Sequence, residues 1–367
     1  MMNHTICLRT TPSVRKNYNG IDLAKFICSI LVIMIHIRPF GTSTEYTTKL
    51  LNYGVQNWLA RISVPIFFAC SGFFLYRKTT LRSFSVEPSK QYIAHLLKLY
   101  IIWTLIYFPL RFRTFFNDPK GVLHAVGLYC RDCIFTGSYT QLWYFPALIF
   151  AVFLTTYPLS VRIRYKHVLA FSIIAYLIGL LAQSWFGIIR PLQKDSPFLW
   201  HLLKILQIFI VTTRDGLFDG FFFVNIGAFF AFYDVHITKM RALTGFFISM
   251  TMMFVEAFFL KYINFVKAHD MYLFLIPATF FGFAFISRVE LPEHPIFLKL
   301  RKISSLIFYS HLWVKTLIRK GFQLIDASLL GTPLLFISTT LFTLIASSAV
   351  VRLSEKKRFQ WLRLFYT

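Results

Sequence analysis

Four polar residues lie on one face of an apolar stretch near the start of the chain, residues 21–40. They are Asp22, Lys25, Ser29 and His36. Because a helix turns by about 100° per residue, Lys25 and His36 point in nearly the same direction, about 16 Å apart along the axis. Ionisable groups at membrane depth are costly and often mark function, and histidine commonly carries protons in catalysis. This polar face is therefore a candidate catalytic site, although an Asp22–Lys25 ion pair with His36 at the membrane interface is the structural alternative.

A second polar group surrounds Arg61 at the start of a long apolar run. Arg61 is followed by Pro65 and by the pair Ser71-Gly72. Proline frees a backbone carbonyl, and a Ser-Gly pair allows close helix approach or a break. A cation in such a run needs a partner, so we expect Arg61 to face a polar cavity or an acidic group. The alternative is that Arg61 snorkels to the outer interface.

Further polar groups lie inside or at the ends of other apolar stretches. Trp143 and Tyr144 begin one stretch and could instead be aromatic residues of the interfacial belt. Arg214-Asp215-Gly216 begins another stretch, and Ser304 and His311 lie on one helix face. Glu256 lies inside a further stretch, and we expect it to pair with a buried cation or with Lys261.

Several cofactor and metal motifs do not occur in this sequence. There is no P-loop, no nucleotide-binding Gly-x-Gly-x-x-Gly unit, and no His-Glu-x-x-His or Gly-x-Ser-x-Gly motif. ATP-driven transport and zinc proteolysis therefore lack support, and we expect neither a bound cofactor nor a metal. Cys130 and Cys133 form a single Cys-x-x-Cys pair, for which a disulfide or two idle thiols are simpler interpretations than a zinc site.

Membrane helices must position these groups, because the composition excludes a water-soluble globule. Of 367 residues, 56% are apolar, only 15% are charged and 44 are Phe. A soluble domain needs a more polar exterior, and disordered chains are poor in aromatic and aliphatic residues. The apolar runs are also too long and too uniform for barrel strands, which alternate polar and apolar residues.

Ten apolar stretches qualify as transmembrane helices, which need about 20 residues. They cover residues 21–40, 56–76, 94–110, 142–161, 168–189, 216–233, 243–260, 271–287, 303–317 and 327–351. Residues 201–213 are too short to span and are predicted to form an interfacial helix, so nine to eleven spans fit. We predict an all-α, polytopic helical bundle. These limits divide the chain into three parts: a cytoplasmic tail (1–20), one transmembrane domain (21–352) and a basic cytoplasmic tail (353–367).

The distribution of Lys and Arg predicts the orientation in the membrane. With both termini in the cytoplasm, every inside loop carries Lys or Arg, as the positive-inside rule requires. The net charge of +24 then reflects mainly the basic residues of the inside loops. These residues predict anionic lipid of the inner leaflet, and not nucleic acid, as the partner of the positive charge. Residues 1–20 contain no cleavable signal, so the first span is expected to be its own signal anchor.

Five sequence blocks resemble, in order, those of the acyltransferase type 3 family of bacterial integral-membrane O-acyltransferases. The first is Gly20-Ile21-Asp22 followed by Lys25, ten residues and His36, where the family usually has Arg in place of Lys25. The others are Arg61-x3-Pro65-x-Phe67-Phe68-x3-Gly72, Leu142-Trp143-Tyr144, Arg214-Asp215-Gly216 with Asp for the family's Asn, and Tyr309-Ser310-His311. The resemblance runs through nearly the whole chain and implies a bundle of ten spans.

The resemblance also implies an activity at the bacterial cytoplasmic (inner) membrane. An acyl group, commonly acetyl, would pass from cytoplasmic acyl-CoA (acetyl-CoA) to a hydroxyl of a glycan or lipid-linked glycan of the envelope. His36 would act as general base or acyl relay, Lys25 would contact the CoA phosphates, and Asp22 would complete the catalytic set. The expected substrate-binding residues are Arg61, Ser71, Trp143, Tyr144, Arg214 and His311, of which the two arginines would stabilise developing negative charge.

Two other functions are compatible with the sequence. The same fold forms the membrane half of vancomycin-resistance serine racemases, which is associated with serine supply, so a transporter of serine or another small solute is the main alternative. A catalytically silent component of an envelope-polysaccharide complex is the third function.

Overall fold

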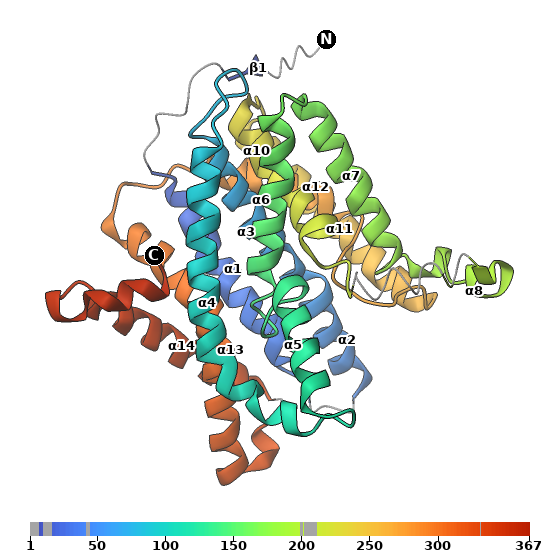
Figure 1. Cartoon of the computed structure of the whole chain (residues 1–367), viewed down its shortest axis with the longest axis vertical. Coiled ribbons are helices and arrows are strands. Elements are labelled where there is room, and N and C mark those ends of the chain that lie inside the picture. Colours follow the sequence, from blue (N-terminus) through green and yellow to red (C-terminus); the bar gives the residue numbers. More distant parts are fainter. Residues whose placement is uncertain (1–6, 10–16, 42–44, 199–200, 202–210, 331) are drawn as a thin grey trace. The chain divides into compact units, whose positions relative to one another are not determined.

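The described part of the chain is almost entirely helical (Figure 1). The computed structural model describes residues 7–9, 17–41, 45–198, 201, 211–330 and 332–367. Within these ranges the only strands are β1 (Cys7–Leu8) and β2 (Tyr233–Asp234), which form one short antiparallel pair. The predicted all-α class is confirmed.

The chain forms two compact units. The α13 unit comprises residues 15–67 and 284–367, and the α10 unit comprises residues 1–14 and 68–283. The boundary between the units falls within α3 (Ser63–Tyr76) and within α12 (Leu275–Ile286).

In the α13 unit, α13 (Pro295–Ile325) packs against α1 (Asn19–Ile37) and α14 (Pro333–Leu353). α1 and α13 run in the same direction, because Asp22 contacts Arg301 near their starts and His36 contacts Lys315 further along. The unit also contains α2 (Tyr46–Asn57), η1 (Leu59–Ile62), η4 (Ala327–Leu329) and η5 (Lys357–Phe365).

The start of α1 is fixed against the segment that precedes α13. The side-chain amide of Asn19 donates to the carbonyls of Leu291 and Pro292, at 3.2 and 3.0 Å. A Cβ on Gly20 would lie 2.6 Å from the carbonyl oxygen of Ile286, so glycine is needed for this close approach. The first position of the Gly20-Ile21-Asp22 block therefore serves packing.

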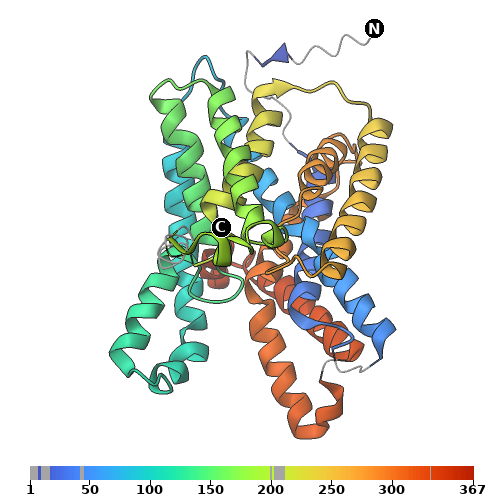
Figure 2. The same cartoon turned by 90° about the vertical axis from the view of Figure 1, so that its right-hand side faces the viewer.

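The α10 unit is built around α10 (Phe221–Phe232), an apolar helix whose residues are nearly all buried. Its neighbours α6 (Tyr144–Ser160), α7 (Tyr165–Leu181) and the π-helix η3 (Gly216–Gly220) pack against it. The unit also contains η2 (Phe186–Ile188), α8 (Leu192–Asp195), α11 (Lys239–Tyr262) and the paired helices α4 (Glu87–Phe116) and α5 (Val122–Phe135), which Figure 2 shows in teal.

Two glycines let α3 and α10 approach closely. A Cβ on Gly72 would collide with the carbonyl of Val224, and a Cβ on Gly227 would collide with the carbonyl of Ala69. The close helix approach predicted from the Ser71-Gly72 pair is confirmed, and it follows from the small residues on both helices.

Five helical segments are long and apolar enough to cross a membrane: α1, Tyr46–Tyr76 (α2, η1 and α3), α4, α11 and α14. Shorter apolar helices occupy the predicted spans 142–161, 168–189, 216–233 and 271–287, and α13 contains the predicted span 303–317. The chain is a multi-pass membrane protein, whereas a total of ten spans stays a prediction. Most of the interfacial helix predicted for residues 201–213 lies outside the described residues.

Candidate active site

The end of α1 and the middle of α13 bring two histidines together. The ring centroids of His36 and His311 lie 5.3 Å apart, with the ring planes tilted by 31°. The packing of two parallel helices produces this contact, which joins the first and the last of the five sequence blocks.

Hydrogen bonds of the His311 ring fix which nitrogen carries the proton. Nδ1 lies 3.0 Å from the carbonyl oxygen of Ile307 and 2.9 Å from that of Phe308. Because a carbonyl oxygen can only accept, Nδ1 is the donor, and in the neutral ring Nε2 keeps its lone pair. Nε2 is buried and has no hydrogen-bond partner within the described ranges. The neutral form of His311 therefore has a basic nitrogen without a protein partner among the described residues.

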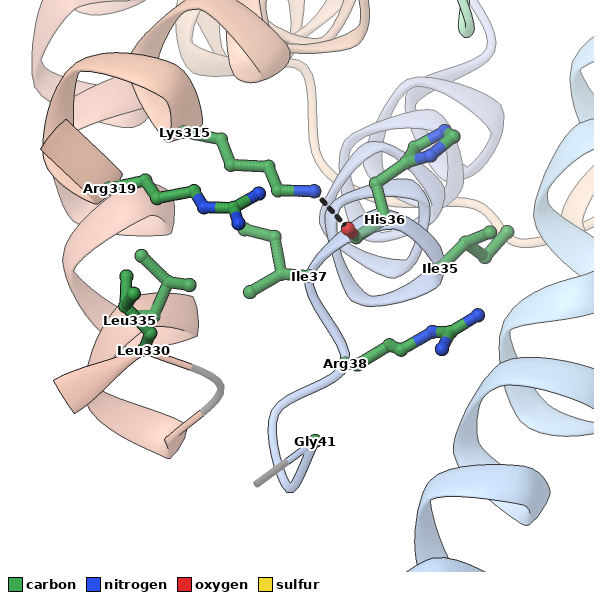
Figure 3. Close-up of a pocket in the computed structure, with 9 residues that line it drawn as sticks. All are labelled: Ile35, His36, Ile37, Arg38, Gly41, Lys315, Arg319, Leu330 and Leu335. Atoms are coloured by element: carbon green, nitrogen blue, oxygen red, sulfur yellow. Dashed lines mark hydrogen bonds between the residues drawn. The ribbon is translucent and has the colours of Figure 1, made fainter. Parts of the chain in front are cut away.

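A pocket of about 510 Å³ adjoins the end of α1 (Figure 3). Its lining residues are Ile35, His36, Ile37, Arg38, Gly41, Lys315, Arg319, Leu330 and Leu335. Lys315 Nζ donates a hydrogen bond of 2.6 Å to the backbone carbonyl of His36 and so caps the last turn of α1. Figure 3 shows Lys315 and Arg319 extending side by side from α13 toward the end of α1, while the His36 ring points away from them.

Near the start of α1, Asp22 forms a two-pronged ion pair with Arg301 of α13. Nε and Nη2 of Arg301 each donate to one carboxylate oxygen at 2.8 Å. The Asp22 side chain is fully buried, and this fork is the strongest geometry that a carboxylate and a guanidinium can form. The cation that holds Asp22 thus comes from another helix, which the spacing along α1 could not indicate.

The other polar residues of this unit lie in different environments. Ser29 is buried and donates to the carbonyl of Phe26 at 2.7 Å, while Lys25 is half-buried. Arg61 lies in η1, and its Nη2 donates to the side-chain oxygen of Asn57 at 3.2 Å, so one of its partners is a neutral amide. Of the catalytic and binding residues predicted in this unit, only His36 is among the described residues that line the pocket.

In the α10 unit, four of the predicted substrate-binding residues form one connected cluster. Ser71 Oγ and the Tyr144 hydroxyl share a hydrogen bond of 3.1 Å. The Phe68 ring packs on Tyr144 at 4.6 Å and on Trp143 at 6.0 Å between centroids. Trp143 in turn carries the Arg214 guanidinium 4.8 Å above its ring. The cluster presents hydroxyls, an indole and a cation, a set that suits a polar substrate.

Arg214 is held by a distant acid, whereas Asp215 is held by the start of η3. Arg214 Nη1 donates to Asp270 Oδ1 at 3.3 Å. Asp215 accepts the backbone N–H groups of Leu217 and Phe218, both at 2.9 Å, and thereby caps the helix. Burial raises the pKa of Asp215 to about 6, although the two N–H groups act in the opposite direction.

The expectation for Glu256 needs correction. Its carboxylate accepts the Trp185 indole N–H at 2.7 Å and the backbone N–H groups of Leu273 and Phe274 at 2.7 and 2.9 Å. These N–H groups directly precede α12, so Glu256 binds the positive end of a helix where we expected a cationic side chain.

The described residues contain no group of three or more His, Cys, Asp or Glu that could hold a metal. Cys130 and Cys133 are free thiols.

Sequence reasoning missed three basic residues of α13: Arg301, Lys315 and Arg319. Arg301 and Arg319 lie at the two ends of an apolar stretch, where basic residues are common. Lys315, however, lies inside the predicted span 303–317, four residues after His311. A cation at that depth was a detectable indication of function.

Comparison with known proteins adds two findings. A family model described as an acyltransferase domain matches residues 18–352. No solved structure gives a significant match.

The similar curated proteins are longer than this chain. One is named amino-acid racemase, from Enterococcus faecalis, and is 31% identical over 261 residues. Another is named serine/alanine racemase, from Enterococcus gallinarum, and is 29% identical over 275 residues. The matches cover 70% and 73% of this chain but 35% and 37% of those proteins, so the chain spans about a third of their length.

Proposed function

The chain belongs to the family of acyltransferase domains, and from that premise we propose that it is an integral-membrane O-acyltransferase. The acyl group, commonly acetyl, would come from cytoplasmic acyl-CoA and end on a hydroxyl of a cell-envelope or secreted glycan. The observation that carries this proposal is the contact of His36 with His311, whose Nε2 is buried and unoccupied.

In the proposed reaction His36 is the general base. It takes the proton of the acceptor hydroxyl as the oxygen attacks the thioester carbonyl, and a tetrahedral intermediate forms. The intermediate collapses with loss of the CoA thiolate, which takes the proton from the imidazolium, so that an ester and free CoA result. His311 Nε2 would accept a hydrogen bond from the His36 ring and stabilise the imidazolium, much as a third group orients the base in other transferases.

The remaining residues would bind and position the substrates. Lys25 is proposed to contact the CoA phosphates as a point charge. Asp22 would act indirectly, because its ion pair with Arg301 fixes the starts of both helices. Arg61, Ser71, Trp143, Tyr144 and Arg214 are proposed to bind substrate or to stabilise the developing negative charge.

The proposed setting is the bacterial cytoplasmic membrane, with both termini in the cytoplasm. In that orientation the His36 end of α1 faces outward and the Asp22 end faces the cytoplasm. A donor from inside and an acceptor from outside would then meet along α1, whose polar face extends about 16 Å from Lys25 to His36.

The test is acyl transfer by the purified full chain in detergent, measured with acetyl-CoA labelled in the acetyl group. We expect release or transfer of acetyl that falls at least about 100-fold in His36→Gln, since general bases contribute that much or more. His167, an exposed residue of α7, provides the matched control, and His167→Gln should keep the wild-type rate. Equal rates in the two variants would remove His36 from the mechanism.

A second variant tests the contribution of His311. In His311→Asn the amide N–H can replace the Nδ1 donor to Ile307, while the basic nitrogen is lost. We expect a rate loss of about 10-fold or more with little change in thermal stability. A wild-type rate in this variant would show that the histidine pair serves packing only.

The names of the similar proteins support a second candidate, the transport of an amino acid. The racemases named above act on amino acids, and the cations that line the pocket at the end of α1 could bind a carboxylate. Uptake of labelled serine into proteoliposomes, without acetyl-CoA turnover, would favour transport over acyl transfer.

A further inference from the structure

The pocket at the end of α1 has an unbalanced charge. Three of its nine lining residues are cationic, namely Arg38, Lys315 and Arg319, and none of the described residues that line it is acidic. Among the described residues, no ion pair involves any of the three. The other lining residues are largely aliphatic, and Arg38 and Arg319 are exposed, so a ligand can reach both guanidinium groups from solvent.

Helix capping explains only part of this positive charge. The end of α1 carries about half a negative charge, and Lys315 satisfies it by donating to the carbonyl of His36. Lys315 and Arg319 are four residues apart on one face of α13, a spacing at which like charges repel. Arg38 and Arg319 therefore add positive charge that no protein group in the described ranges neutralises.

We propose that Lys315 and Arg319 bind an anionic group of the acceptor, a carboxylate or a phosphate carried by the molecule whose hydroxyl is acylated. This inference rests on the proposed function and narrows its acceptor to an anionic sugar or a similar hydroxylated anion. The guanidinium can bind a carboxylate or phosphate through two N–H groups, and the ammonium adds a point charge.

The geometry separates this anion site from the reacting atoms. Lys315 and Arg319 extend toward the end of α1, while the His36 ring points away from them (Figure 3). The bound anion is therefore a part of the acceptor remote from the reacting hydroxyl, and its binding energy holds the acceptor in place. A cavity of about 510 Å³ falls within the size range of small-molecule sites and has room for more than a bare ion.

The experiment measures binding of three sugars to the purified full chain in a neutral detergent at low salt, by calorimetry. Glucuronate and glucose 6-phosphate supply the two anions, and glucose is the neutral control of similar size. We expect both anionic sugars to bind at least about 10-fold more tightly than glucose, as charge-assisted hydrogen bonds would give.

Two variants locate the anion site. Arg319→Gln should weaken binding of the anionic sugars about 10-fold and leave glucose unchanged. Lys320→Gln is the matched control, because Lys320 is an exposed neighbour on α13 outside the pocket lining. Equal binding of all three sugars, or an equal effect of the two variants, would overturn the proposal.

An arm with lipid distinguishes a soluble anion from a lipid headgroup. The wild-type chain and Arg319→Gln are compared in nanodiscs of phosphatidylcholine with and without phosphatidylglycerol. If phosphatidylglycerol occupies the site and the anionic sugars neither bind nor compete, the site holds a headgroup and the acceptor proposal is wrong. If the anionic sugars bind equally well in both membranes, the proposal stands.

The acetyl-CoA assay keeps this inference separate from the proposed function. Turnover that depends on His36, without preference for anionic sugars, would remove the anion site alone. Preference for anionic sugars without turnover would remove acyl transfer and leave an anion-binding membrane protein.

Discussion

The two ends of the α1–α13 contact hold their charges in opposite ways. Near the start of α1, one carboxylate meets one guanidinium through two hydrogen bonds of 2.8 Å, and Asp22 is fully buried. Near its end, three cations line a pocket in which no described residue is acidic. At the first end the side-chain charges neutralise each other, whereas at the second end no described lining residue supplies a negative charge.

This difference separates structural charges from functional charges. A buried ion pair whose donors and acceptors all match mainly fixes helix register, because either partner alone would be costly. Cations that line a cavity and form no ion pair among the described residues are instead suited to bind a ligand. In the sequence Asp22 and His36 share one polar face of one helix, so only the contacts with α13 tell the two kinds of site apart.

The largest effect should come from breaking the balanced end. Asp22→Ala leaves the Arg301 guanidinium without its partner. Because the Arg301 side chain is 39% exposed, water offsets part of this loss, and we expect the free energy of unfolding to fall by about 2 kcal/mol. Thermal or denaturant unfolding of the full chain in detergent measures this loss. In the double variant Asp22→Ala, Arg301→Ala the loss should be smaller than the sum of the two single losses.

The pair Arg9–Asp234 is the control for this prediction. Nε and Nη2 of Arg9 both donate to one oxygen, Asp234 Oδ1, at 3.1 and 2.6 Å, and the Asp234 side chain is 47% exposed. Asp234→Ala should therefore cost less than about 1 kcal/mol. Equal losses at the two pairs would mean that burial does not determine how much Asp22 contributes to the free energy of unfolding.

The sequence predicts the helices and many of the important residues, because both depend on local patterns. Each of the ten predicted spans contains a helix, whereas α5 lies where no span was predicted. The Ser71-Gly72 pair allows a close helix approach, which the structure shows at Gly72, although the sequence does not name α10 as the partner. Gly20, which belongs to the first sequence block, also has a structural role, because its lack of a side chain permits a close approach at the start of α1.

The partners of these residues could not be predicted, because they come from distant parts of the chain. Asp22 and Arg301 are 279 residues apart, as are His36 and Lys315. Helix periodicity places a residue on a face, but it does not say which helix covers that face. The same limit explains Glu256, whose N–H partners at the start of α12 have no recognisable side-chain pattern.

A smaller effect is expected from removing the cap at the unbalanced end. Lys315→Gln removes the charged donor to the carbonyl of His36 and should lower the free energy of unfolding by about 1 kcal/mol. The loss is smaller than at Asp22, because the variant also removes repulsion from Arg319. Arg319→Gln, measured in the same way, should change stability by less than about 0.5 kcal/mol. A loss for Arg319→Gln as large as that for Asp22→Ala would mean that the cations of the pocket are structural.

The smallest effect concerns a buried acid that has N–H partners in place of a cation. Asp215 caps η3, and burial raises its pKa to about 6, above the usual value of 3.8. Ionisation thus costs more in the folded than in the unfolded chain, so this group contributes stability below about pH 4 that is lost as the pH rises through 6.

Asp215→Asn keeps an oxygen acceptor for the two N–H groups and removes the charge. It should stabilise the chain at pH 7.5, and the gain should vanish as the pH falls from 6 to 4. Asp118, whose pKa is lowered mainly by the backbone N–H of Lys120, is the control, because Asp118→Asn should give no gain at pH 7.5. A gain at Asp215 that does not change with pH would show that the carboxylate charge is compensated there, as it is at Asp22.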